Sequence, residues 1–235
     1  MQRFKLIGLS LLAVLLFSAV ATATASAALP EILPVPTEAT PLTFTTTGEG
    51  NAVLLTTAGK EIVCKKSKSE GKFTSADKGE TTIKFNECTT EKGAVKCKNA
   101  EAEEILLSKY VIHLVTLKLK PGLTVLGLGL LVLIPSTLLA FTCGVLKILV
   151  LGAVIGEFLG INTLEKIKTT ETRKLAFLEE KSGLQLYRTC EELKAVCEGK
   201  EFLLKSTFTT LEHEELASQL TTQVVSLGKE AEVHF

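Results

Sequence analysis

Hydrophobic and polar residues alternate in several short stretches of this chain, and glycine, proline or polar turn residues bound each stretch. In Thr81–Cys88, for example, the apolar Ile83 and Phe85 stand between polar neighbours. Alternation with a period of two places successive side chains on opposite faces, so one face of the stretch is mainly apolar. A series of such stretches predicts an all-β fold, either an antiparallel β-sandwich or an open barrel.

Turn residues join neighbouring stretches into predicted hairpins. Ala52–Thr57 and Glu61–Lys66 flank the sequence Ala-Gly-Lys, and Lys72–Ser75 and Thr81–Cys88 flank Asp-Lys-Gly-Glu. β-Branched residues on both sides of such a turn are typical of antiparallel strand pairs. Farther along, Glu171–Tyr187 predicts another pair of strands around Lys-Ser-Gly.

The C-terminal part of the chain is ambiguous. Glu201–Thr210 has the pattern of a strand, whereas Thr209 and Glu212 have the capping-box spacing of a short helix. Gln219–Leu227, however, is rich in Thr and Val, which favour strands. We therefore expect at most one helical turn, followed by a terminal hairpin that ends at Phe235.

The chain has no charged side chain from Pro121 to Leu146. Within this run, Leu123–Ile134 contains only 12 residues between Gly122 and Pro135, whereas a membrane helix needs roughly 20. The Pro-Gly pair at its start fits the two central positions of a type II turn, so we expect the chain to reverse there. We predict that Leu123–Ile134 is a central strand covered on both faces. A membrane helix over 121–146 is the alternative.

The N-terminus has the three parts of a secretory signal peptide. Arg3 and Lys5 precede the apolar run Leu6–Val20, and small residues follow as far as Ala28. We expect a signal peptide over 1–27, cleaved after Ala25 or Ala27, and an uncleaved anchor is the alternative because the uncharged segment is nearly long enough to span a bilayer.

The remainder of the chain predicts one domain. Residues 28–40 hold three of the six prolines and predict an extended lead-in. Residues 41–235 suit a single β-rich domain, with a sub-boundary near 158–170 as the alternative.

Charge and aromatic content narrow the range of partners. The whole chain has 26 basic and 26 acidic side chains, so it lacks the field that draws proteins to nucleic acids. It has no Trp and only two Tyr, which argues against a sugar-stacking surface. Contact with the cell envelope or with an apolar small molecule remains open, and contact with a membrane is not favoured.

Six cysteines in an exported chain predict disulfide bonds. Their spacing suggests two local bridges, Cys88–Cys97 and Cys190–Cys197, which leaves Cys64 to pair with Cys143. Free buried thiols are the alternative. No C-x-x-C motif is present, so a zinc or thioredoxin-like site has little support.

The sequence predicts no catalytic, cofactor-binding or metal-binding residues. His213 lacks the second histidine of a zinc-protease helix, His113 stands between apolar neighbours, and His234 is close to the C-terminus. The acidic cluster Ala100–Glu104 lacks the spacing of a calcium loop. The motif S-x-x-K begins at Ser69, Ser75 and Ser226, but the other motifs of serine acylation are missing.

Parts of the chain resemble a family of exported β-rich proteins of soil actinobacteria to which no activity is assigned. The most specific of these parts are the stretch around Cys64, the Asn-Glu-Cys of Asn86–Cys88 and the Phe-Thr-Cys-Gly of Phe141–Gly144. The resemblance covers most of the chain after the signal peptide. It implies export and β structure, and it implies no site residues.

These observations lead to an expected function without catalysis. We expect a secreted, disulfide-stapled protein that acts as an extracellular or cell-surface binding or structural module. The alternatives are a barrel that carries an apolar ligand and a membrane-tethered protein that spans at 121–146. An extracellular hydrolase would require carboxylates that meet only in the fold.

Overall fold

The computed structural model describes residues 30–90, 94–99, 104–118, 126–161, 165–167, 170–181, 183–187, 204–208 and 214–234. Within these ranges the secondary structure consists of strands, and no helix is present. The strands are β1 (Glu31–Leu33), β2 (Leu42–Thr56), β3 (Glu61–Phe73), β4 (Lys78–Thr90), β5 (Cys97–Lys98), β6 (Glu104–Lys118), β7 (Leu126–Cys143), β8 (Leu146–Phe158), β9 (Glu165–Ile167), β10 (Thr172–Phe177), β11 (Glu179–Lys181), β12 (Leu184–Gln185), β13 (Lys205–Phe208), β14 (Glu214–Leu227) and β15 (Ala231–His234).

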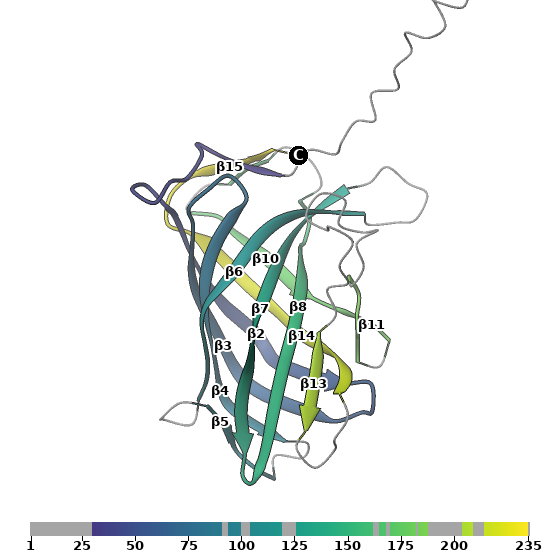
Figure 1. The fold of residues 1–235 in the computed structure, drawn as a ribbon. Coiled ribbons are helices and arrows are strands. Elements are labelled where there is room, and N and C mark those ends of the chain that lie inside the picture. The colour runs from purple at the N-terminus through teal and green to yellow at the C-terminus, as the bar shows by residue number, and fades with distance from the viewer. Residues whose placement is uncertain are drawn as a thin grey trace, which may run out of the picture.

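The main sheet closes on itself into an antiparallel barrel (Figure 1). Its strands follow the order β14, β2, β3, β4, β6, β7 and β8, and both β10 and β13 then pair with β8 on one side and β14 on the other. The predicted all-β antiparallel fold is confirmed. Of the two expected architectures, the structure has the barrel. The expected barrel was open, whereas the pairing of β10 and β13 with β14 closes this one.

At two places around the barrel, a long strand pairs with two different strands, one at each of its ends. β10 pairs with the C-terminal end of β14, and β13 pairs with its N-terminal end. In the same way, β5 pairs with the end of β7, while β6 pairs with the beginning of β7. The side chain of Asn99 joins β5 to β6, because its amide accepts from Leu106 N at 2.7 Å and donates to Leu106 O at 2.9 Å.

Most of the uncharged run Pro121–Leu146 lies in strand β7. Leu128, Leu130 and Val132 belong to the core cluster inside the barrel, whereas Leu131 packs in a second cluster on the outer face that includes Tyr187. Both faces of the strand are therefore covered, as the sequence predicted. The alternative of a helix over 121–146 is wrong, because Leu126–Cys143 forms a strand; the Pro121–Gly122 turn lies outside the described residues.

In the described ranges, no helix has the length and hydropathy to cross a membrane.

A small three-stranded sheet lies across one end of the barrel. β15 pairs with β1 and with β9, at the top of Figure 1. Ile32, Ala231 and Val233 from this sheet are buried in the barrel core. The predicted terminal hairpin is wrong, since β14 already has β2 on one side and β10 and β13 on the other and has no free edge for β15. The proposed helical turn at Thr209 lies outside the described residues, and β14 continues as a strand from Glu214.

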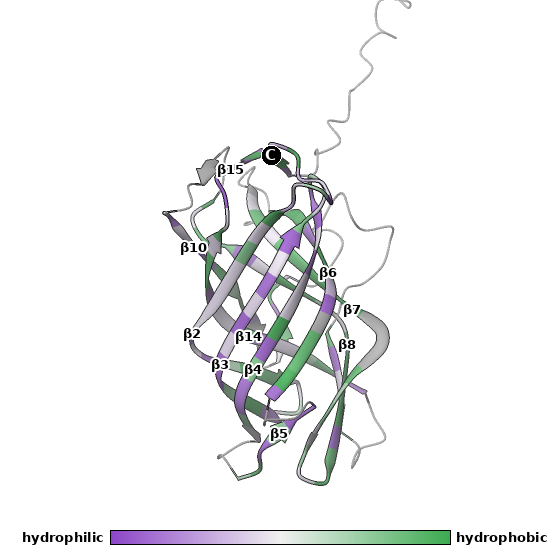
Figure 2. Ribbon diagram, turned by 90° about the vertical axis from the view of Figure 1, so that its left-hand side faces the viewer, coloured by the Kyte–Doolittle hydropathy of each residue, from purple (hydrophilic) through white to green (hydrophobic). Residues whose placement is uncertain are grey.

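The outer face of β2, β3 and β4 meets water. Figure 2 shows hydrophilic positions along β3. Charged side chains pair across this face, for example Lys72 with Glu80 at 3.3 Å and Lys65 with Glu87 at 3.5 Å. The Lys66 ammonium, hydrogen-bonded to Glu87, holds the pKa of that carboxyl below its usual value. The alternation in these strands thus separates a charged exterior from an apolar interior.

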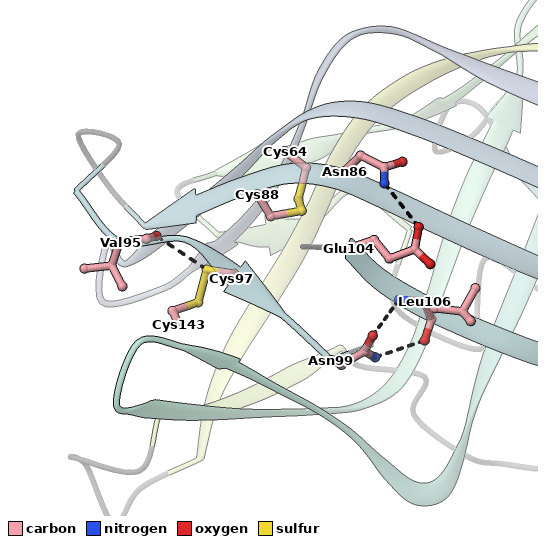
Figure 3. The surroundings of a disulfide bond; sticks show 9 residues. All are labelled: Cys64, Asn86, Cys88, Val95, Cys97, Asn99, Glu104, Leu106 and Cys143. Carbon is pink, nitrogen blue, oxygen red and sulfur yellow. Dashed lines mark hydrogen bonds between the residues drawn. A yellow bond between two sulfur atoms is a disulfide. The ribbon is translucent and has the colours of Figure 1, made fainter. Parts of the chain in front are cut away.

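The disulfide bonds join neighbouring strands instead of closing local loops (Figure 3). Cys64 on β3 is bonded to Cys88 on β4, its direct partner in the strand register. Cys97 on β5 is bonded to Cys143 on β7, again its register partner. The predicted pairings Cys88–Cys97 and Cys64–Cys143 are therefore wrong, because strand register and not sequence spacing brings the sulfur atoms together. Cys190 and Cys197 lie outside the described residues.

Peptide mapping without reduction tests this connectivity. Trypsin should release the peptide 61–65 linked to the peptide 85–92, and Cys97–Lys98 linked to a peptide that ends at Lys147. Reduction should separate each pair, which serves as the control. A peptide that joins Cys88 to Cys97 would contradict the pairing of β3 with β4 at this position.

Candidate ligand-binding cavity

The barrel interior contains a cavity of about 90 Å³. Its wall is formed by side chains from β2, β3, β4, β6, β7, β8, β10 and β14, together with Leu204 next to β13. Most of these side chains are aliphatic or aromatic. Among the described residues that line it, none carries a charge. The cavity is thus an apolar space enclosed by the whole circumference of the barrel.

The apolar side of the cavity comes mainly from β6, β7 and β8. Leu107, Leu130, Val132, Phe141 and Val150 line it, and all five are buried in the core. These strands pair with one another in the sheet, so their inward side chains form a continuous apolar wall. This wall can contact a hydrocarbon surface but offers it no hydrogen bond.

The polar groups of the cavity come mainly from the opposite side, where β14, β2 and β3 place them beside apolar side chains of β2 and β3. Thr46 lies directly across from Ser69 in the strand register, and their hydroxyl oxygens are 2.6 Å apart. The Thr46 hydroxyl donates to Gln223 Oε1 at 2.6 Å. Since a hydroxyl has one proton, Ser69 must donate to Thr46. All three side chains line the cavity, and they form a hydrogen-bonded chain that ends at the Gln223 amide.

Thr221 and Thr81 extend this polar side. Thr81 donates to Glu70 O at 3.1 Å, which satisfies its hydroxyl proton. The buried Thr221 Oγ1, in contrast, has no hydrogen-bond partner among the residues that the structure describes. Leaving a buried hydroxyl without a partner costs about 1–3 kcal/mol. One wall of the cavity therefore carries groups that can form hydrogen bonds with a ligand, and the other wall carries only apolar side chains.

A second cavity of about 40 Å³ lies next to the first. Phe44, Thr46, Leu130 and Leu175 line both cavities and so form the partition between them. The Phe44 ring lies where a side chain at Gly71 would be, because a Cβ at Gly71 would collide with the ring. Glycine at this position thus leaves room for the aromatic partition inside the barrel.

The second cavity is closed by the small end sheet. Ile32, Ala231 and Val233 line it, so β1 and β15 cover this end of the interior. Arg173 contributes to its wall and is bonded to Glu171, with 3.0 Å between Nη2 and Oε2. Arg173, the one charged side chain among the described residues that line either cavity, is therefore paired with a carboxylate.

The barrel wall is interrupted between β10 and β13, and side chains take the place of a strand there. β10 pairs with β14 from Thr221 onward and β13 pairs as far as Leu216, which leaves Ala217–Leu220 between them. The Gln185 amide accepts from Gln219 N at 3.0 Å and donates to Gln219 O at 3.4 Å. Gln185 thus makes the two hydrogen bonds that a strand residue would make.

A partly buried ion pair lies at the β13 side of this interruption. Lys60 Nζ is 2.8 Å from Glu215 Oε1 and 4.8 Å from the centre of the Phe208 ring. The hydrogen bond from Lys60 holds the pKa of the Glu215 carboxyl below its usual value. This pair ties the β2–β3 turn to β14, outside the cavity.

The residues that the sequence singled out do not form a site. His113 Nδ1 lies 3.8 Å from Asp77 Oδ2, and burial is the main cause that lowers the pKa of this histidine. His234 lies on β15 near Glu232, with 3.4 Å between Nε2 and Oε2. His213 lies outside the described residues. Neither His113 nor His234 lines the cavity.

Two of the three S-x-x-K serines, Ser69 and Ser75, bond to groups other than the side chain of their lysine. Ser69 faces the cavity and bonds to Thr46, whereas Lys72 pairs with Glu38 and Glu80. Ser75 bonds within its own turn, where its hydroxyl lies 3.3 Å from Asp77 Oδ1. Ser69 is therefore a residue of the cavity wall, and Ser75 is a turn residue.

The acidic cluster is described only at Glu104, which accepts from Asn86 at 3.3 Å. In the described part of the chain, no group of three His, Cys, Asp or Glu residues lies close enough to hold a metal ion.

The polar wall residues were missed by the sequence analysis. Thr46 stands in a run of three threonines and Thr221 in a pair, so their pattern does not reveal which hydroxyl faces inward. Gln223 alternates with Val225, and that signal alone could have indicated a polar residue on an inward face.

Comparison with protein-family models, with curated proteins and with solved structures finds no match to this chain.

Proposed function

We propose that this protein is an exported, non-catalytic binding protein that holds a small, mainly apolar molecule inside its barrel. The observation that carries the proposal is the enclosed cavity of about 90 Å³ with its apolar lining. Well-packed cores leave few spaces larger than a water molecule, so a space of this size needs an explanation. An apolar cavity of about 150 Å³ binds benzene. The two cavities here, of about 90 Å³ and about 40 Å³, are separated by the partition at Phe44, so a ligand of that size has to displace this side chain.

Export is supported by the disulfide bonds. Cys64–Cys88 and Cys97–Cys143 are bonded, and disulfides form and persist in oxidising compartments. Secretion to the extracellular space or the cell surface fits the predicted signal peptide. A carrier of small apolar molecules at that location would act outside the cytoplasm, where such molecules pass between cells and their surroundings.

The ligand-binding proposal predicts uptake of small apolar probes by the native chain. Toluene should shift the methyl resonances of cavity residues such as Val150 and raise the unfolding temperature, because a ligand that binds only the folded state stabilises it. A cavity-filling Val150→Phe variant should lose both effects. The control is Val145→Phe, which places the same ring on a residue that is 98% exposed.

A structural or surface module without a ligand gives a different result. If toluene leaves the resonances and the unfolding temperature of the native protein unchanged up to its solubility limit, the ligand-binding proposal is wrong. Equal responses of Val150→Phe and Val145→Phe would also contradict it, because binding would then occur elsewhere.

A further inference from the structure

We propose that the ligand is a neutral molecule with an apolar body and one oxygen that bonds to Thr221 and Gln223. This inference rests on the proposed function and adds the chemical class of the ligand. It follows from the polar wall of the cavity, where two neighbouring inward-facing side chains of β14 have hydrogen-bonding capacity that the described residues do not use.

The Gln223 side chain is held in one orientation. Its Oε1 accepts from Thr46, and Thr46 in turn accepts from Ser69. The Nε2 group, which has two N–H donors, makes no hydrogen bond to a described residue. Gln223 is only 5% exposed and lines the cavity. An oriented amide of this kind offers a donor to an oxygen in the cavity.

Thr221 provides the second group. It is 6% exposed, and its buried Oγ1 has no partner among the described residues. It is two positions from Gln223 on the same strand, so both side chains point to the same face. A hydroxyl can donate and accept. Together the two side chains can bond a carbonyl or hydroxyl oxygen, and such a bond would remove the cost of leaving Thr221 unpaired.

The charge of the lining decides against an ionised ligand. Arg173 lines the second cavity and is paired with Glu171, and none of the described residues around the first cavity is charged. A carboxylate placed there would lose its hydration without gaining a cation, which disfavours it strongly. The lining therefore fits small neutral alcohols, ketones or phenols and disfavours acids.

The test compares phenol, toluene and benzoate, which share the ring and differ in one group. Binding to the full chain is measured by titration calorimetry and methyl chemical shifts. We expect phenol to bind more tightly than toluene, and benzoate not to bind. In Thr221→Val and Gln223→Leu, phenol affinity should fall roughly three- to tenfold, the effect of losing one hydrogen bond, while toluene affinity should be kept or increased.

Thr116→Val is the matched control, because Thr116 Oγ1 is also buried without a described partner but does not line either cavity. It should leave the affinity for phenol unchanged. If phenol and toluene bind but the cavity variants do not separate them, or if benzoate binds more tightly than phenol, the assignment of the ligand class is overturned and the cavity function stands. If no probe binds, both are overturned.

Discussion

Leu128→Asp is expected to prevent folding of the barrel. Leu128 is 1% exposed and lies in the core, next to the second cavity. A carboxylate there would be buried without a cation, at a cost of several kcal/mol, and the whole stability of a domain is about 5–15 kcal/mol. Circular dichroism should show loss of the β signal, and the cooperative thermal transition should disappear.

Val145→Asp provides the control for this experiment. Val145 lies in the turn between β7 and β8 and is 98% exposed, so the same carboxylate stays in water. The variant should fold and unfold like the native protein. A folded Leu128→Asp variant with an unchanged transition would mean that β7 is not a core strand.

The part of β7 up to Ile134 was predictable because its signal is local, whereas its continuation through Pro135 to Cys143 was not expected. The Pro-Gly pair before it and the 12-residue length of Leu123–Ile134 both favoured a strand over a membrane helix. The sequence could not reveal what covers the outer face, because that cover comes from Leu186 and Tyr187, far along the chain. Burial of both faces was thus predictable, but the partners were not.

The predicted cysteine pairing was wrong, although the sequence contained a signal for the bond between Cys64 and Cys88. Cys64 and Cys88 lie equally far from Ala76, at the turn between β3 and β4. Antiparallel strands that leave one turn pair residues at equal distances from it. The register of the predicted hairpin therefore places these two residues opposite each other. For Cys97 and Cys143 no such signal exists, because β5 meets β7 across a non-local pairing.

The candidate site was the least predictable feature. A cavity arises from the combined volume of inward side chains from eight strands, which no single stretch encodes. The polar wall depends on which of several adjacent threonines points inward, and the register shift between Leu220 and Thr222 changes that assignment on β14. Closure of the barrel through β10 and β13 likewise depends on long-range pairing.

Loss of either disulfide bond is expected to destabilise the protein more than loss of a bridge within a short loop would. Cys64–Cys88 closes a separation of 24 residues and Cys97–Cys143 one of 46. In the loop-entropy model these loops correspond to about 3.5 and about 4 kcal/mol. In Cys97→Ala/Cys143→Ala, the midpoint of urea unfolding should therefore fall, and the slope of the transition should rise because the unfolded chain becomes less compact.

The two double variants both remove buried sulfur atoms, and they differ in whether they also enlarge the first cavity. Cys64 lines the first cavity, so Cys64→Ala/Cys88→Ala also enlarges that space and adds a packing loss. Cys97 and Cys143 do not line it. If entropy dominates, the Cys97/Cys143 variant loses as much stability as the other or more, and it keeps toluene binding. A loss of less than about 1 kcal/mol would show that the link between β5 and β7 does not restrict the unfolded chain as the model requires.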